Sequence, residues 1–122
     1  MLPAQARLRR RPEFTEVVRS GRRAGRPTLV LHYLAERPAP PDGGAADPGG
    51  PRAGFVVGKG VGNSVCRHRV TRQLRHLVRE ELHRLPAGTD LVVRARPGAA
   101  DADAATLRRD LVRGLDRVLD RA

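Results

Sequence analysis

The sequence predicts a single small domain of the α+β class, and three observations support this prediction. The chain has 122 residues, which is enough for one hydrophobic core. Three segments carry apolar residues at helical spacing, and three others are short runs of branched and aromatic residues that are typical of strands. Along the chain they follow one another as helix, strand, strand, helix, strand, helix. We therefore expect one domain over residues 1–122, with at least three strands.

The first predicted helix follows a basic N-terminal segment. Residues 1–11 carry several arginines, and we expect them to be flexible. Pro12 suits a first helical position, and Gly21 suits the end of the helix. The apolar face between them has i, i+3, i+4 spacing and comprises Phe14, Val17 and Val18.

Two strands come next, separated by an insertion. Residues 28–34, TLVLHYL, and residues 52–57, RAGFVV, have the composition of strands. Residues 38–51 between them, PAPPDGGAADPGGP, are too rich in proline and glycine for a helix or a central strand. We interpret this segment as a loop insertion at the surface. A binding arm is the alternative, but the segment contains no arginine, which favours a simple insertion.

The second half of the chain predicts two longer helices around a third strand. The first of these helices begins near Asn63 or Ser64, either of which can cap it, and it ends before Pro86. Residues 90–96, DLVVRAR, predict the strand. The last helix is expected over residues 103–120. Its polar face mixes arginines with aspartates, which is typical of a solvated surface, and we assign it no function.

The charge balance indicates a nucleic-acid partner. The chain has 24 Lys and Arg against 13 Asp and Glu, a formal net charge of +11 and a pI of about 11.6. A GC-rich genome explains why all these cations except Lys59 are arginines, but it does not explain their excess over the acids. A domain this basic is typical of nucleic-acid-binding proteins.

Other features exclude several classes of protein. The single cysteine, Cys66, excludes an internal disulfide and a multi-cysteine metal site. No apolar run approaches the length of about 20 residues that spans a membrane. The N-terminal residues lack the apolar segment of a secretory signal. We expect a soluble, cytoplasmic protein with no membrane partner.

The most informative segment is residues 59–79, KGVGNSVCRHRVTRQLRHLVR. A glycine-rich loop is followed by arginines at every third or fourth position. At about 100° per residue, most of these arginines lie on one side of a helix and the apolar residues on the other. Arg67 is the exception, because the same spacing places it at the edge of the apolar side. The candidate binding residues are Lys59, Asn63, Arg67, His68, Arg69, Arg72, Arg75 and Arg79.

Arginine suits a phosphate backbone because its planar guanidinium binds phosphate oxygens in pairs. The backbone amides near the N-terminus of the helix also favour an anion. An ordinary solvated helix is the alternative interpretation. Against it, the helix carries acids only near its end, at Glu80 and Glu81, whereas the last helix mixes both signs throughout. A dedicated binding face is therefore favoured.

The sequence does not support catalysis by protein side chains. The glycine-rich loop lacks the Lys-Ser/Thr pair of a phosphate-binding nucleotide loop. No cluster of acids near the arginines could hold the metal ions of a nuclease. The histidines are scattered, at His32, His68, His76 and His83. We predict no catalytic residues and no metal ligands in the protein.

These residues resemble the bacterial ribonuclease P protein family. The hallmark of that family is an Arg-Asn-Arg-x-x-Lys-Arg helix preceded by Lys-x-x-Gly-Asn/Lys-Ala-Val, and residues 59–72 correspond to it. Residues 7–21 and 91–97 resemble the family's first helix and its last strand and turn. Three positions depart from the family pattern, where an asparagine, a lysine and a basic residue are replaced by His68, Thr71 and Gly60.

The resemblance implies a fold and a function. The fold is the ribosomal protein S5 domain 2-like fold, a central mixed sheet with a left-handed βαβ crossover, against the usual right-handed rule. The function is that of an RNA-binding subunit that helps a catalytic RNA to remove the 5′ leader of precursor tRNA, with Mg²⁺ held mainly by the RNA and the substrate. The implied partners are the ribonuclease P catalytic RNA, through the arginine helix, and the 5′ leader, in a cleft. The family's cleft positions correspond to Phe14, Val18, Val30 and His32.

Two alternatives belong to other functional classes. A structural, ribosomal-type RNA-binding protein without a processing role shares the charge, and indifference to the leader would distinguish it. A helix-based DNA binder is disfavoured, because a strand and a glycine-rich loop precede the basic helix where a helix-turn-helix has a second short helix. We expect no DNA partner.

Overall fold

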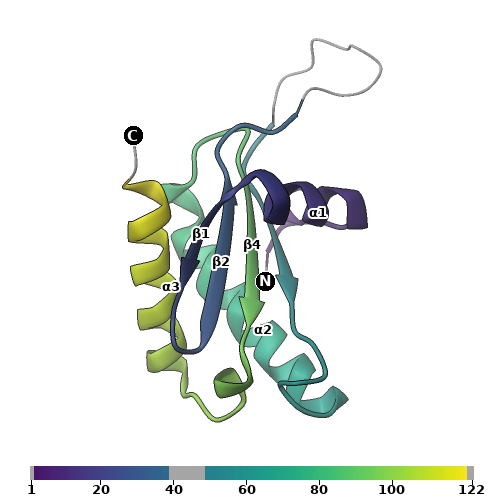
Figure 1. Cartoon of the computed structure of the whole chain (residues 1–122), viewed down its shortest axis with the longest axis vertical. Helices are drawn as coiled ribbons and strands as arrows, with labels where there is room; N and C mark the ends of the chain where they lie inside the picture. The colour runs from purple at the N-terminus through teal and green to yellow at the C-terminus, as the bar shows by residue number, and fades with distance from the viewer. Residues whose placement is uncertain (1, 39–48, 121–122) are drawn as a thin grey trace.

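The computed structural model describes residues 2–38 and 49–120, which form a four-stranded mixed sheet with three α-helices (Figure 1). In chain order these elements are α1 (Arg11–Ser20), β1 (Arg22–Gly25), β2 (Leu29–Leu34), β3 (Arg52–Val56), α2 (Ser64–Glu81), β4 (Asp90–Ala95) and α3 (Ala104–Leu119). The strand order is β1-β2-β4-β3. β2 pairs antiparallel with both β1 and β4, whereas β3 and β4 are parallel.

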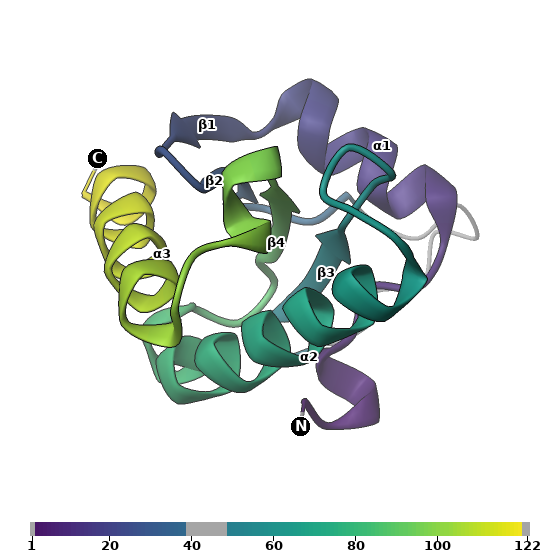
Figure 2. The same ribbon diagram turned by 90° about the horizontal axis from the view of Figure 1, so that it is seen from below.

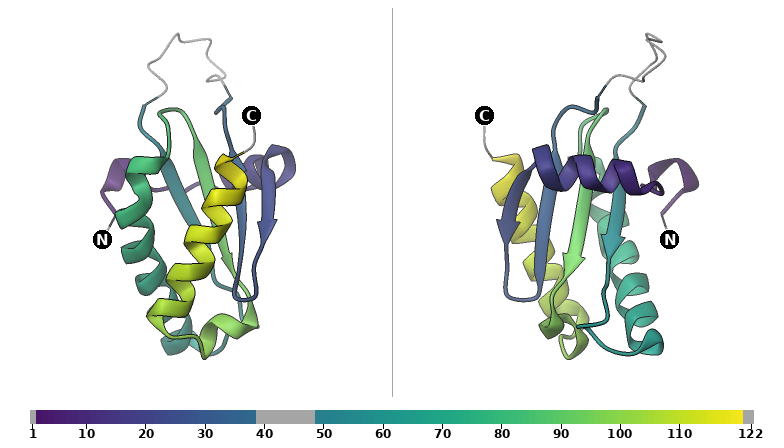
Figure 3. Two further views of the ribbon diagram at one scale, coloured as in Figure 1. Left: turned by 90° about the vertical axis from the view of Figure 1, so that its left-hand side faces the viewer. Right: turned by 45° about the vertical axis from the view of Figure 1, so that its right-hand side comes forward.

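The helices lie on both faces of the sheet. α2 and α3 cover one face side by side, and α1 crosses the other face near one end of the strands (Figures 2 and 3). α2 connects the parallel strands β3 and β4 across the covered face, and the views in Figures 1 and 2 make this βαβ crossover left-handed. This is the crossover that the family resemblance implied, and it departs from the right-handed rule.

The main core lies between the sheet and the helices α2 and α3. Leu29 and Leu31, alternate residues of β2, are fully buried in it, as the two-residue period of a strand requires. A smaller cluster beneath α1 comprises Leu8, Val17 and Val92. It anchors α1 to the other face of the sheet, part of which is left exposed.

The predicted helices and strands are confirmed, with small shifts at their ends. The Asn63 side-chain oxygen caps α2 by accepting a hydrogen bond from the Cys66 amide at 2.9 Å. Asp103 caps α3 in the same way, through the Thr106 amide at 2.8 Å. β1 is absent from the predicted elements because its sequence, RRAG, contains a single buried residue, Ala24.

The N-terminal segment differs from the flexible tail that we expected over residues 1–11. Leu2, Ala6 and Leu8 are at most 6% exposed, and the Leu8 amide donates a hydrogen bond to the Ala53 carbonyl oxygen at 2.9 Å. The segment is therefore attached to β3 by apolar residues that lie between its arginines. Of the predicted insertion at residues 38–51, residues 39–48 lie outside the described part of the chain.

Candidate nucleic-acid interface

The outer face of α2 presents cations to the solvent. His68, Arg72 and Arg79 are exposed, and no acid in the described part of the chain forms an ion pair with either arginine. The opposite side of the helix packs into the core, so the charged face stands on a rigid support. The residues buried on that side are Val70, Leu74, Leu77 and Val78.

The two acids at the end of α2 are engaged elsewhere. The Glu80 carboxylate lies 3.3 Å from both His76 Nε2 and Arg108 Nη1. The Glu81 carboxylate lies 3.3 Å from Arg84 Nη1. Both acids are therefore committed to the border with α3 and to the turn after α2, and they leave the arginines of the outer face unneutralised.

Three of the predicted binding residues lie at the borders of this face. Arg69 donates a hydrogen bond to the Ala100 carbonyl oxygen at 2.6 Å, which commits its guanidinium to the turn before α3. Arg67 is half-buried, as its helical position predicts. Arg75 is also half-buried and lines a groove on the side of β3. The centre of the exposed face is thus formed by fewer cations than the helical spacing suggested.

The loop before α2 exposes Lys59 and fixes the start of the helix. The amide of the buried Val61 donates a hydrogen bond to the Gly58 carbonyl oxygen at 3.1 Å. Gly62 has a φ of 154°, and a Cβ at this position would lie 3.1 Å from the Cβ and Sγ atoms of Cys66, so the position requires glycine. Lys59 and the cap residue Asn63 therefore lie at the N-terminal end of the exposed face of α2.

A cationic groove of about 220 Å³ separates α2 from the N-terminal segment. Arg7 and Arg9 line it from the N-terminal segment, Thr71 and Arg75 line it from α2, and none of its lining residues is acidic. Arg7 and Arg9 were not among the predicted site residues, because they lie in a segment that we expected to be flexible. The apolar Leu8 between them could have indicated that this segment packs against the domain.

A second cleft, of about 320 Å³, lies between α1 and the open face of the sheet. The predicted residues Phe14 and Val18 line it, and Val18 is 38% exposed. The remaining lining residues are Thr15, Arg19, Val56 and Arg94. The cleft combines an apolar wall with two arginines, which is a chemistry that suits the bases and phosphates of a single strand.

Gly54 of β3 determines how closely α1 approaches the sheet. A Cβ atom at this position would collide with the ring of Phe14 and would lie 2.9 Å from the Leu8 Cβ. The absent side chain therefore lets Phe14 pack directly on the backbone of β3. This contact sets one wall of the cleft.

The other two predicted cleft residues, Val30 and His32, lie in β2 and are 5% and 4% exposed. The strand register pairs Val30 with Arg94 and His32 with Val92. The structure therefore brings Phe14 and Val18 to the wall of the cleft but buries Val30 and His32 in the neighbouring strand.

His32 is a polar group that β2 buries almost completely. Neither of its ring nitrogens has a hydrogen-bond partner in the described structure. Burial lowers the pKa of its imidazole, and the positive charges of Arg94 and Arg23 lower it further. The ring is therefore uncharged near neutral pH and adds no cation to the cleft.

Val56 and Arg94 were not among the predicted site residues. The parallel register pairs them across β3 and β4, so their side chains lie on the same face of the sheet. The alternation of side chains along each strand could have indicated that these two residues face the same way. It does so only once the pairing of the two strands is known.

Over residues 2–38 and 49–120, no group of three or more His, Cys, Asp or Glu side chains lies close enough together to hold a metal ion. None of the described helices has the length and apolar character needed to cross a membrane.

Comparisons with known proteins all find similarity to ribonuclease P proteins. The Ribonuclease P family matches residues 2–119. The ribonuclease P protein component of Streptomyces griseus is 56% identical over 119 residues, covering 98% of this chain and 96% of that protein. The corresponding protein of Corynebacterium diphtheriae is 49% identical over 118 residues, covering 97% of each.

Solved structures show the same fold. The ribonuclease P protein of Thermotoga maritima superposes with a TM-score of 0.72 at 25% identity, over 92% of this chain and 96% of that one. That of Staphylococcus aureus superposes with a TM-score of 0.75 at 21% identity, over 92% and 94% of the two chains. The four-stranded mixed sheet with its three helices is therefore a known architecture.

Proposed function

The chain belongs to the ribonuclease P protein family, and from this premise we propose that it binds the catalytic RNA through α2 and the 5′ leader of precursor tRNA through the cleft beneath α1. The family provides the protein component of the endoribonuclease that processes the 5′ end of tRNA. The reaction is hydrolysis of a phosphodiester bond. The part proposed for this chain is to neutralise phosphate charge and to position the substrate.

The unneutralised cationic face of α2 is the observation that carries the proposal for the catalytic RNA. Arg72 and Arg79 are exposed on a helix whose other side is locked into the core. The groove lined by Arg7, Arg9 and Arg75 continues this positive surface toward the N-terminal segment. Guanidinium groups at fixed positions displace condensed counterions from RNA, which favours binding at low salt.

The cleft supports the binding of a single-stranded leader. Phe14 offers a ring on which a base can stack, and Val18 offers an exposed apolar contact. Arg19 and Arg94 supply the charge for neighbouring phosphates. Because His32 is buried, stacking rests on Phe14, and the arginines supply the larger part of the binding.

Ribonuclease P is generally a Mg²⁺-dependent enzyme. The exposed arginines of this chain do not suit Mg²⁺, which takes oxygen ligands, because a guanidinium is a positively charged group that only donates hydrogen bonds. We propose that Mg²⁺ is held by the catalytic RNA and the substrate. The positive charge of the protein then lowers the Mg²⁺ concentration that the RNA needs.

A triple variant, Arg72→Ala, Arg75→Ala and Arg79→Ala, tests the role of α2. We expect weaker binding to a ribonuclease P RNA in a filter-binding titration. The slope of log affinity against log salt should become shallower by about 0.9 for each phosphate that the variant no longer neutralises. Arg69 is left in place because its hydrogen bond to Ala100 supports the fold.

Arg108→Ala is the control for this variant, since it removes an exposed arginine that is already paired with Glu80 on the neighbouring helix. It should leave both the affinity and the salt slope close to their wild-type values. Unchanged affinity and an unchanged salt slope in the triple variant would contradict the assignment of α2 to the catalytic RNA.

A further inference from the structure

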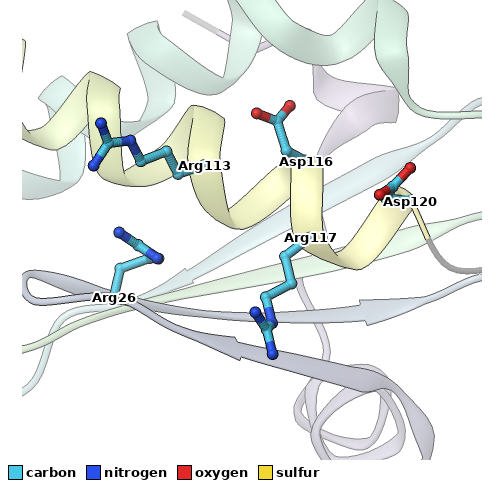
Figure 4. Close-up of a pocket in the computed structure, with 5 residues that line it drawn as sticks. All are labelled: Arg26, Arg113, Asp116, Arg117 and Asp120. Carbon is cyan, nitrogen blue, oxygen red and sulfur yellow. The ribbon is translucent and has the colours of Figure 1, made fainter.

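α3 carries a row of arginines on the side that faces β1. Arg109, Arg113 and Arg117 are exposed and are spaced four residues apart, so they lie in line along the helix. Arginines of β1 and of the turn that follows it lie opposite this row, and Figure 4 shows Arg26 of that turn beside Arg113. We name this surface the β1–α3 seam and define it by Arg22, Arg23, Arg26, Arg109, Arg113 and Arg117.

The other side of α3, which packs beside α2, is neutralised. Arg108 lies 3.3 Å from Glu80, and Asp116 lies 2.6 Å from Arg84. By contrast, no acid in the described part of the chain lies within ion-pair distance of Arg113 or Arg117. Arg113 and Arg117 therefore carry unpaired positive charge on the seam, although Asp116 and Asp120 line the hollow beside them.

The unpaired arginines have a cost in stability. Like charges four residues apart on a helix repel each other, and Arg113 and Arg117 stand at that spacing, whereas Arg109 lies 3.7 Å from Asp110. An anion bound along the row would relieve the repulsion.

Two hollows along the seam share Arg117. The larger, of about 550 Å³, is lined by Arg26, Arg113, Asp116, Arg117 and Asp120 (Figure 4). The smaller, of about 150 Å³, is lined by Arg22, Arg23, Arg117 and Val118. The two hollows therefore adjoin each other at Arg117.

The hydrogen bonds within the seam leave several arginines available. Arg22 is committed to the protein, since it donates to the Val118 carbonyl oxygen at 2.7 Å and so ties β1 to the end of α3. Of the two acids in the larger hollow, Asp116 is engaged by Arg84. The buried Nε of Arg26 has no hydrogen-bond partner in the described structure. Arg26, Arg113 and Arg117 can therefore donate to an anion.

The sheet connects this seam with the cleft beneath α1. One row of paired residues crosses all four strands, from Val56 through Arg94 and Val30 to Gly25. Val56 and Arg94 line the cleft, and Gly25 at the other end directly precedes Arg26. With strands about 4.8 Å apart, the row spans about 14 Å. Gly25 is exposed and has no side chain, and the Arg96 guanidinium lies beside it, 3.0 Å from the position that a Cβ would take. The path from the cleft to the seam at this point therefore runs over a cation.

Building on the proposed binding of the leader in the cleft, we propose that leader nucleotides lying 5′ of those in the cleft cross β1 at Gly25 and place their phosphates on Arg26, Arg113 and Arg117. Continuity with the cleft favours the leader over the catalytic RNA. The seam also lies at the β1 edge of the sheet, whereas α2 lies beneath the β3 edge (Figure 2). Because the seam offers guanidinium donors, it reads the backbone and not the base sequence.

The test measures the affinity of the reconstituted holoenzyme for precursor tRNA with leaders of about 4, 8 and 16 nucleotides, the range of site sizes in single-strand-binding folds. The double variant Arg113→Gln, Arg117→Gln should bind the substrate with the longest leader about tenfold more weakly than the wild type does, which corresponds to the loss of two exposed ion pairs. The shortest leader should bind equally well to both proteins. Arg108→Gln, on the neutralised side of the same helix, should behave like the wild type at every length.

Equal binding of all leaders by the double variant and the wild type overturns the seam proposal. A loss that is uniform across leader lengths and is accompanied by weaker assembly with the catalytic RNA also overturns it, because the seam would then bind that RNA. If the wild type shows no dependence on leader length, the proposed function of the cleft fails as well. The behaviour of the wild type therefore distinguishes the two failures.

Discussion

His32 shows what a single buried side chain contributes beside the cleft. Its ring is 4% exposed, neither nitrogen has a partner in the described structure, and Arg94 and Arg23 lie close enough to lower its pKa. A buried polar group without a hydrogen bond costs about 1–3 kcal/mol. The side chain is therefore tolerated in its neutral form and disfavoured when it is protonated.

Acidification should consequently destabilise the protein through His32. The folded pKa lies below the ordinary value of 6.5, so the unfolded chain takes up the proton first. The folded protein is therefore most stable, with respect to this group, above pH 6.5, and it loses free energy of unfolding as the pH falls from 6.5 toward the folded pKa. Urea unfolding at about pH 7.5 and about pH 5.5 should show a larger loss for the wild type than for His32→Phe. The same loss in both proteins would contradict this role.

At the scale of elements, the position of α1 depends on charged contacts with the sheet. The Glu13 carboxylate accepts a hydrogen bond from the Arg10 amide at 3.1 Å and lies 2.8 Å from Arg52 of β3. Arg52 in turn lies 2.8 Å from Asp90 of β4. These contacts connect the start of α1 with two strands of the sheet, and α1 forms a wall of the cleft.

Glu13→Ala should destabilise the fold by about 1–2 kcal/mol, because it removes a contact at the helix N-terminus together with an ion pair. Burial raises the pKa of Glu13, but the hydrogen bonds and the charge of Arg52 outweigh it and hold the pKa below 4.5. The contribution should therefore be complete at neutral pH and fade as the pH falls below 4.5. Urea unfolding measures both effects, with the exposed Glu36→Ala as the control. Equal stability of the two variants at neutral pH would rule out this contribution.

How far each element could be predicted depended on how much apolar pattern it carries. α2 and α3 have long apolar stripes and side-chain caps at Asn63 and Asp103. The start of α2 and both ends of α3 were predicted to within about a residue, whereas α2 ends at Glu81, earlier than Pro86 suggested. β1 buries only Ala24, so its sequence carries no strand pattern. The strand forms because it pairs with β2. The N-terminal segment was expected to be flexible because its arginines outweigh the apolar residues that attach it to β3.

The residues of the candidate site were likewise predictable where they lie on one element, and unpredictable where several elements bring them together. The cations of α2 lie on one helix, so their spacing predicted a common face, although Arg69 and Arg75 turned out to lie at its borders. The cleft joins Phe14 of α1 to Val56 and Arg94 of two strands, and the seam joins Arg26 to Arg113 and Arg117. Such combinations depend on strand register and helix packing, which no local pattern encodes. The family resemblance assigned His32 to the cleft, but its burial could be seen only in the structure.

At the scale of the whole molecule, the net charge of +11 is distributed over separate surfaces. The outer face of α2 and its groove lie at the β3 edge of the sheet, and the seam lies at the β1 edge (Figure 2). The cleft beneath α1 lies between them on the opposite face. This arrangement places the cationic face of α2 and the seam at opposite edges of the sheet, while the groove and the cleft adjoin each other at Phe14.

Cleavage of precursor tRNA by a bacterial ribonuclease P RNA at low Mg²⁺ tests the central claim most directly. The reaction is measured with and without this protein, on substrates whose leader is long or is cut to a nucleotide or two. We expect the protein to stimulate cleavage, the stimulation to fade with the shortened leader, and the Arg72, Arg75 and Arg79 triple alanine variant to lose it. No stimulation with a matched RNA would contradict the proposed function and favour a structural RNA-binding role without processing.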